Sequence, residues 1–194
     1  ADVEIVVDGR NILHLAWTDR LADERRLFYA SLDSQGRLNS YPKPISLPGV
    51  SVDSYAMGIN PQGDIDLFWS AREGEEPGLY HLRLDMWGKV TGENLRLRPN
   101  GFDPTFQRDR QGTIHLAWQE QPSYGQYRLY YAAFDYQNRT LDPTELAEYR
   151  VPLAVVGHRP SLGFAGDDVY IFWSSEVRGG GLTRPSATSF YLAF

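Results

Sequence analysis

Hydrophobic and polar residues alternate along four stretches of the chain, and each stretch ends in tryptophan. Alternation of this kind is typical of a β-strand, because successive side chains point to opposite faces of a sheet. In the first stretch, Leu13, Leu15 and Trp17 therefore share one face, and His14 and Ala16 share the other. Both faces are largely apolar, which predicts sheets that are covered on both sides. The stretches are 12–17, 65–69, 114–118 and 169–173.

The tryptophan strands recur with a period of about fifty residues, which is the spacing of β-propeller blades and related repeats. Each is preceded by a short strand and followed by a tyrosine-rich strand and an outer strand. No stretch has the periodicity of a helix, so the predicted fold class is all-β. We expect one β-propeller domain over 1–194, built from four-stranded blades of about fifty residues. The blades are placed at approximately 1–48, 49–99, 100–152 and 153–194.

The fourth copy is expected to lack its outer strand, because the sequence stops one residue before the turn that follows the third strand in the other copies. The strand from Phe190 to Phe194 is then an open, largely apolar edge, and such edges favour self-association. We therefore expect a fragment of a larger propeller. A compact four-bladed ring and an eight-bladed ring made by two copies are the alternatives.

Composition narrows the classes of function. The net charge is −6 and no basic stripe is present, which argues against nucleic acid as a partner. The chain has no cysteine, so it forms neither disulfides nor thiolate metal sites. No apolar run approaches the roughly 18 residues that span a bilayer, so no membrane insertion is expected. Dinucleotide, phosphate-loop and zinc-protease motifs are absent, and we predict no cofactor and no metal.

The connections that follow the tryptophan strands are predicted to be long and differ from one another: 18–26, 70–78, 119–127 and 174–188. Variable loops on a repeated frame are common binding sites, and these loops would meet at one face of the propeller. The alternative is that their charged residues are only solvated loop residues. The candidates are Asp19, Arg20, Arg72, Glu73, Glu120, Tyr124, Glu176, Arg178 and Arg184.

A second candidate set stands just before the innermost strands, which converge on the axis of a propeller at the same face. Two carboxylates across this channel could act as acid and base, or hold a cation. Alternatively, Asp53 and Asp103 begin their strands and bind their own turns. The set comprises Asp2, Asp53, Asp103, His158 and Arg159.

Histidines and tryptophans at repeated positions are interpreted as structural. His14 and His115 occupy the same position in alternate copies, which would hold them too far apart to share a metal, so each is expected to be a buried histidine with its own partners. The repeated tryptophans are expected to be core residues rather than ligand platforms. They are Trp17, Trp69, Trp118 and Trp173.

The phrase Gly-x-Ile-His-Leu-Ala-Trp at 112–118, with a tyrosine-rich strand and an Asp-x-x-Gly turn, resembles the blades of sialidase-like (BNR-type) β-propellers. The resemblance extends over all four copies. The Asp-box of that family reads Ser-x-Asp-x-Gly-x-Thr-Trp, whereas 31–38 has its glycine one residue later and lacks the Thr-Trp pair. The resemblance implies a propeller fold, an extracellular or periplasmic location, and acids and arginines near the axis that contact glycan.

The repeated frame carries unrelated loops but no complete catalytic motif. We therefore expect a non-catalytic propeller module that binds a glycan or a protein through the face carrying the long loops. One alternative is a sialidase-like glycoside hydrolase that uses Asp53, Asp103 and Arg159. The other is a structural segment of a larger surface protein.

Overall fold

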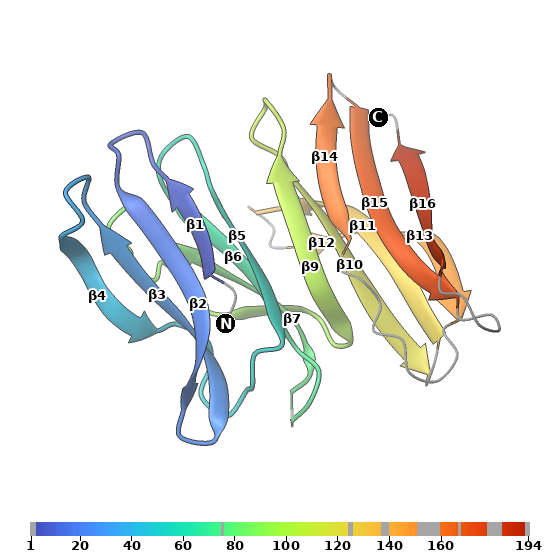
Figure 1. Ribbon diagram of the computed structural model, residues 1–194, viewed down its shortest axis with the longest axis horizontal. Coiled ribbons are helices and arrows are strands. Elements are labelled where there is room, and N and C mark those ends of the chain that lie inside the picture. Colours follow the sequence, from blue (N-terminus) through green and yellow to red (C-terminus); the bar gives the residue numbers. More distant parts are fainter. Residues whose placement is uncertain are drawn as a thin grey trace. The chain divides into compact units, whose positions relative to one another are not determined.

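The computed structural model describes residues 3–74, 76–123, 126–136, 140–150, 160–166, 168–177 and 184–192. All regular elements in these ranges are β-strands, paired in antiparallel sheets (Figure 1). The predicted fold class, all-β, is therefore confirmed. The chain divides into two compact units, Ala1–Phe102 and Asp103–Phe194, and each is described by itself.

The first unit holds two four-stranded sheets in which strands adjacent in sequence pair in order. This connectivity arises because short turns join each strand to the next, which permits only antiparallel neighbours. The first sheet contains β1 (Val3–Val7), β2 (Leu13–Leu21), β3 (Glu24–Leu32) and β4 (Leu38–Pro44). The second sheet contains β5 (Ser54–Ile59), β6 (Ile65–Ala71), β7 (Gly78–Leu84) and β8 (Leu95–Arg98).

The second unit also holds two sheets, and the boundary between the units falls within the first strand of the third sheet. The third sheet contains β9 (Gly101–Arg108), β10 (Ile114–Ser123) and β11 (Gln126–Asp135), and both β12 (Thr140–Leu141) and β13 (Thr144–Arg150) pair with β11. The fourth sheet contains β14 (Ser161–Ala165), β15 (Asp168–Val177) and β16 (Arg184–Leu192).

Each sheet lies inside one of the ranges predicted as blades, and the fourth sheet has three strands among the described residues. In that part of the chain β16 pairs with β15 alone, so it forms an edge of its sheet. Self-association through Phe190–Phe194 stays a prediction, and the last two of those residues lie outside the described ranges. The union of the sheets into one propeller domain, the number of blades and the closure of a ring also stay predictions.

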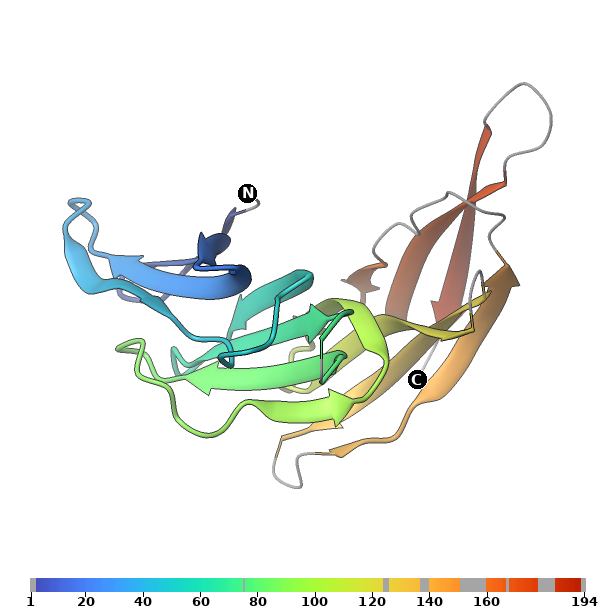
Figure 2. The same ribbon diagram turned by 90° about the horizontal axis from the view of Figure 1, so that it is seen from below.

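The sheets of the first unit lie face to face, and one apolar core fills the space between them (Figure 2). The tryptophan-bearing face of the second sheet contributes Leu67 and Trp69, both with no exposed surface. The first sheet contributes Ala16, Leu27 and Tyr29 from the face opposite Trp17, and these are also fully buried. The tryptophan face of one sheet thus packs on the alanine face of the sheet before it.

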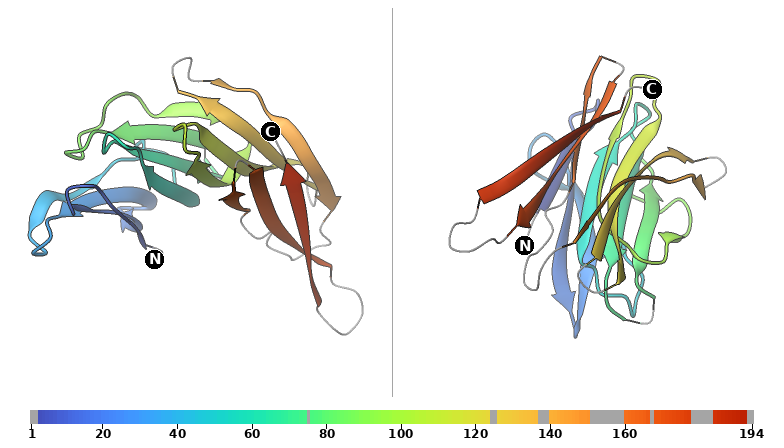
Figure 3. Two further views of the ribbon diagram at one scale, coloured as in Figure 1. Left: turned by 90° about the horizontal axis from the view of Figure 1, so that it is seen from above. Right: turned by 90° about the vertical axis from the view of Figure 1, so that its right-hand side faces the viewer.

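The second unit repeats this arrangement between its own two sheets (Figure 3). Ile171 and Trp173 on the tryptophan face of the fourth sheet are buried against Ala117, Leu129 and Tyr131 of the third sheet. Ala117 of the third sheet stands at the repeat position of Ala16 in the first. Within each unit, therefore, the alternation along a strand separates the side chains that reach the shared core from those on the opposite face.

The expected burial of the repeated tryptophans is confirmed for Trp69, Trp118 and Trp173, which are 0%, 0% and 7% exposed. It is wrong for Trp17, which is only partly buried. The reason is that Trp17 lies on the outer face of the first sheet, where Val3, directly opposite on β1, is 52% exposed. The sequence pattern alone did not distinguish this face from its equivalents in the other sheets.

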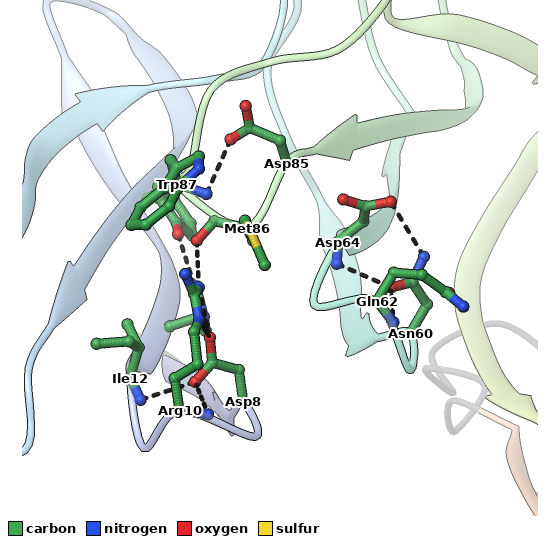
Figure 4. A network of polar contacts seen from close by, with 11 residues as sticks. Asp8, Arg10, Ile12, Asn60, Gln62, Asp64, Asp85, Met86 and Trp87 are labelled. Atoms are coloured by element: carbon green, nitrogen blue, oxygen red, sulfur yellow. Dashed lines mark hydrogen bonds and ion pairs between the residues drawn. The ribbon is translucent and has the colours of Figure 1, made fainter.

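Tight turns join strands at one end of each of the first three sheets, and they share one hydrogen-bonding scheme. The side-chain Oδ1 of Asp8 accepts hydrogen bonds from the backbone N–H groups of Arg10 and Ile12, both at 2.9 Å (Figure 4). Burial by itself raises the pKa of Asp8, but these donors and the Arg10 guanidinium outweigh it and lower the pKa to about 2. The equivalent acceptors in the other turns are Asp33, Asn60, Asp85 and Asp109.

The fourth residue of each of these turns adopts a left-handed backbone. Glycine supplies this conformation at Gly63 and Gly112, with φ values of 91° and 90°. In the first turn, however, the residue with positive φ is Asn11, at 61°, and not Gly9. Asparagine tolerates a left-handed backbone better than most residues, which explains why it can stand where the other turns have glycine.

Replacing Gly88 with alanine is expected to destabilise the protein more than the same change at Gly36, although both have a φ of 77°. A Cβ at position 88 would overlap Cε1 of the fully buried Tyr29, whereas a Cβ at position 36 meets nothing within 4 Å. Both variants bear the left-handed cost of about 1–2 kcal/mol. Gly88→Ala adds about 1–3 kcal/mol from overpacking. Urea unfolding of the two variants measures the difference, and equal midpoints would contradict the close approach to Tyr29.

Candidate functional site

Three of the four connections predicted to be long loops are mainly extensions of the strands. β2 and β3 pair as far as Leu21 and Glu24, and the turn between them contains Ala22 with a φ of 56°. β10 and β11 likewise extend into 119–127, and β15 and β16 into 174–188. Polar residues continue these ladders because backbone hydrogen bonds do not depend on side-chain type. Among the described residues, only the connection from Ala71 to Gly78, between β6 and β7, keeps a loop of the predicted extent.

An ion pair at this end of the first unit joins the two candidate sets. The Nε of Arg72, on the β6–β7 loop, lies 2.8 Å from Oδ2 of Asp53, which directly precedes β5. The Arg72 guanidinium also lies 3.9 Å from the centroid of the Phe102 ring, in cation–π geometry. About a third of each charged side chain is exposed, 34% for Arg72 and 38% for Asp53. The pair is therefore accessible but held in place.

Arg25 of β3 supports this ion pair from the neighbouring sheet. Its Nη1 donates to the backbone carbonyl of Asp53 at 3.0 Å, and its Nε donates to Oγ1 of Thr18 at 3.0 Å. The backbone N–H of Asp53 in turn donates to the carbonyl of Ser70 at 2.7 Å. These contacts fix the backbone of Asp53 between the two sheets. We call the group formed by Arg25, Asp53, Arg72 and Phe102 the Asp53 site.

The Asp53 site offers an acceptor beside a donor. Oδ2 of Asp53 is taken by Arg72, whereas Oδ1 accepts no hydrogen bond from the described residues. A carboxylate only accepts hydrogen bonds and a guanidinium only donates them, while a hydroxyl does both. Two adjacent hydroxyl groups on one ligand therefore match the pair, one donating to Asp53 and the other accepting from Arg72.

Asp103 occupies a different environment from Asp53. It lies inside β9, is 9% exposed, and accepts a hydrogen bond on Oδ2 from Nε2 of Gln119 on β10 at 3.4 Å. It was considered as a residue that begins its strand and binds its own turn, but its partner is on the next strand. Its φ of 50° is unusual for a residue with a side chain, and such backbone strain gathers at functional sites.

The catalytic set proposed from the sequence is not assembled within either unit. Asp53 belongs to the first unit and Asp103 to the second. Arg159, His158 and Asp2 lie outside the described residues. The structure instead brings Asp53, a candidate from the set before the innermost strands, together with Arg72, a candidate from the set of loop residues.

The other loop candidates have varied surroundings. Asp19 accepts a hydrogen bond from the backbone N–H of Arg20 at 2.7 Å, and both residues are exposed near the end of β2. Glu73 is exposed on the same loop as Arg72. Glu120 accepts a hydrogen bond from Nε1 of Trp118 at 3.1 Å. Tyr124 and Arg178 lie outside the described residues; Glu176 and Arg184 belong to β15 and β16, whose side chains there are not described.

The two repeated histidines are buried and have partners, as expected. Nδ1 of His14 lies 2.7 Å from the Tyr29 hydroxyl, and Nδ1 of His115 lies 2.6 Å from the Tyr131 hydroxyl. Nε2 of His115 also lies 3.1 Å from Oδ2 of Asp109. Burial lowers the pKa of His14 below 6.5 and raises the pKa of Tyr131 above 10.0. Both histidines serve the cores rather than an exposed site.

A pocket of about 340 Å³ lies in the second unit, at the end of β9 opposite Asp103. His115, Asp109 and Tyr131 form a closed hydrogen-bonded group, so His115 has both ring nitrogens occupied and is a poor candidate for a proton acceptor. His115 and Asp109 line the pocket together with Arg108, Arg110, Gln111, Phe164, Gly166 and Val169. His14 and His115 occupy the same repeat position and both bind a buried tyrosine of their own sheet, which indicates a structural role. We therefore place the candidate site at Asp53 and not at this pocket.

Sequence reasoning missed Arg25 and Phe102. Arg25 lies between Glu24 and Arg26 in a short run of mixed charge, and Phe102 directly precedes Asp103. No local signal marks either one, since both act through residues more than twenty positions away.

No protein-family model matches the sequence, and no curated protein matches it either. The resemblance to sialidase-like repeats therefore stays a prediction. Nor does any helix among the described residues have the length and apolar character that crossing a membrane requires.

Several solved structures share the fold. An endo-arabinase from Bacteroides thetaiotaomicron is 16% identical, with a TM-score of 0.64 over 97% of this chain and 74% of that one. An endo-1,4-β-xylanase from the same organism is 13% identical, with a TM-score of 0.61 over 100% and 72%. A fucose lectin from Kordia zhangzhouensis in complex with methyl-fucoside is 17% identical, with a TM-score of 0.50 over 77% and 100%. At these identities the likeness shows the fold alone, that of propeller-type carbohydrate-active proteins.

Proposed function

We propose that this chain is a non-catalytic glycan-binding module and that the Asp53 site contacts the sugar. The observation that carries the proposal is the accessible ion pair between Asp53 and Arg72, held by Arg25 and Phe102. Because these side chains are already oriented by protein contacts, little conformational entropy is lost when a ligand binds. The proposal extends to an extracellular or periplasmic location, where such glycans are found.

Neutral sugars suit this site better than a strongly charged ligand. The positive charge of Arg72 and the negative charge of Asp53 largely cancel, and Arg25 is directed to a carbonyl and a hydroxyl of the protein. A sugar ring presents neighbouring hydroxyls that can donate to Asp53 and accept from Arg72 together. The names of the similar structures, an arabinase, a xylanase and a fucose lectin, support sugars as the ligand class.

Replacing Arg72 with alanine is expected to weaken glycan binding at least about tenfold, because it removes a charged donor from the site. A glycan array identifies the ligand, and titration calorimetry then measures the dissociation constant. The matched control is Arg37→Ala, which removes an arginine whose Nε lies 2.7 Å from Asp33 at the other end of β3. Equal affinities for the wild type and the Arg72→Ala variant would contradict the assignment of the site.

A glycoside hydrolase is the second candidate function, favoured by the strained backbone of Asp103. It would require Asp53 and Asp103 as the carboxylate pair and Arg159 as a substrate contact. A panel of chromogenic glycosides separates the two functions: turnover that is lost in both Asp53→Ala and Asp103→Ala would overturn the non-catalytic proposal. Absence of both turnover and glycan binding would favour a protein ligand or a purely structural segment.

A further inference from the structure

The outer face of the first sheet is apolar and open. Val3, Ile5 and Val7 of β1 are 52%, 55% and 55% exposed. The strand register places them directly opposite Trp17, Leu15 and Leu13 of β2, all on one face. The face continues across β3 through Phe28, whose ring stacks on Trp17 with centroids 5.8 Å apart. Contiguous apolar surface of this kind marks an interaction site in a folded protein. We call it the Trp17 face.

The other sheets show what covers such a face. In the second sheet the equivalent residues include Tyr55, Leu67 and Trp69, and they are buried against Ala16 and Tyr29 on the alanine face of the first sheet. In the fourth sheet the equivalent Ile171 and Trp173 are buried against Ala117 and Tyr131 of the third. Within each unit, then, a tryptophan face always meets an alanine face.

The chain also carries an open counterpart for the Trp17 face. Phe172 of β15 stands at the position of Ala16 and Ala117, on the face of the fourth sheet opposite Trp173. It is 49% exposed, whereas Ala16 and Ala117 are fully buried, and its ring stacks with that of Tyr170. A phenylalanine at this repeat position is compatible with full burial, since Phe68 of the second sheet occupies it and has no exposed surface. We call this surface the Phe172 face.

We propose that two copies of this chain associate head to tail, with the Trp17 face of one packing on the Phe172 face of the other. The contact repeats, between molecules, the sheet-on-sheet packing that each unit already contains. Because the two faces differ, the interface is heterologous. A pair of copies still has one open face of each kind, so further copies can add until the assembly closes into a ring.

The test is light scattering of the 194-residue chain over a range of concentrations, together with two variants. Ile5→Lys and Phe172→Glu each place a charge on an exposed position of one face, so both should fold normally. Each is expected to weaken association about a hundredfold or more, because a charge cannot be buried unpaired in an apolar interface. Trp87→Lys, at a turn residue that is 66% exposed and lies off both faces, should associate as the wild type does.

Mixing the two variants gives the decisive result. Ile5→Lys keeps an intact Phe172 face and Phe172→Glu keeps an intact Trp17 face, so an equal mixture should form a one-to-one complex that grows no further. A wild-type chain that remains monomeric at every concentration would overturn the proposal. So would association that persists in both variants, which would instead implicate the β16 edge. Asp53→Ala should associate normally, since this inference is independent of the glycan proposal.

Discussion

Replacing Trp69 with alanine is expected to lower the free energy of unfolding by about 3–5 kcal/mol, the cost of truncating a large buried aromatic residue. Trp69 has no exposed surface, and its ring stacks on Tyr80 with centroids 4.2 Å apart. Its Nε1 also donates to Oδ1 of Asn94 at 2.9 Å, so the variant loses a hydrogen bond as well as packing. Truncation leaves a cavity in the core shared by the two sheets, which can collapse only in part.

The matched control for this variant is Trp87→Ala. Trp87 is 66% exposed at the turn between β7 and β8, where its ring lies 4.7 Å from the Arg10 guanidinium. An exposed cation–π contact contributes about 0.5–1 kcal/mol, so this change should be small. Chemical denaturation of both variants gives the two free energies. Similar losses for Trp69→Ala and Trp87→Ala would show that the core is not where the structure places it.

Replacing Asp66 with asparagine is expected to cost about 3–5 kcal/mol, because it removes the anionic partner of a buried charge network. The Asp66 carboxylate has no exposed surface and lies 2.7 Å from Nε2 of His81 and 2.9 Å from Nε of Arg83. Burial by itself raises the pKa of Asp66, but hydrogen bonds and charges from these two partners outweigh it and hold the pKa below 3.8. The asparagine amide keeps the shape of the side chain and leaves the Arg83 guanidinium without its anionic partner.

The Asp66 carboxylate also makes the free energy of unfolding depend on pH, and the direction of this dependence follows from its lowered pKa. Since the folded state lowers the pKa of Asp66 below 3.8, its contribution is fully present above that pH and is lost as pH falls through the lowered value. The stability difference between the wild type and Asp66→Asn should therefore shrink in strong acid. The control is Asp33→Asn, at a solvated pair with Arg37, where asparagine keeps the turn-capping oxygen and no measurable change is expected. A difference that does not depend on pH would contradict the ionised network.

The Asp66 network also shows where sequence reasoning stopped. Asp66 stands at the repeat position of His14 and His115, so the sequence marked it as a polar residue on a sheet face. That its partners are His81 and Arg83, two residues apart on β7, follows from the register of the two strands. Register is decided by packing and by turn geometry together, and a single strand pattern does not contain it.

Two residues of the Asp53 site were likewise predictable from the sequence, but their contact was not. Asp53 and Arg72 were each identified from their positions in the repeat, but in separate sets and with separate roles. Their contact depends on the β6–β7 loop folding back over the start of β5 and Phe102. A loop conformation depends on the surfaces around it, and those surfaces exist only once the sheets have packed. Three other predicted loops became strands for a related reason, because a hairpin ladder continues until a residue such as Ala22 turns the backbone.

The sequence by itself determined the all-β class, the antiparallel pairing of strands that follow one another in each repeat, the faces that carry tryptophan, and the turns opened by aspartate or asparagine. These features are local or periodic, since alternation sets the strand faces and the turn residues set the hairpins. The tertiary structure alone decided that Trp17 stays partly exposed while Trp69 is buried, that Arg25 and Phe102 join Asp53, and that Asp103 is strained and enclosed. Each of these depends on which surfaces meet, and two strands with similar patterns in the sequence differ in burial as soon as only one of them has a sheet packed against it.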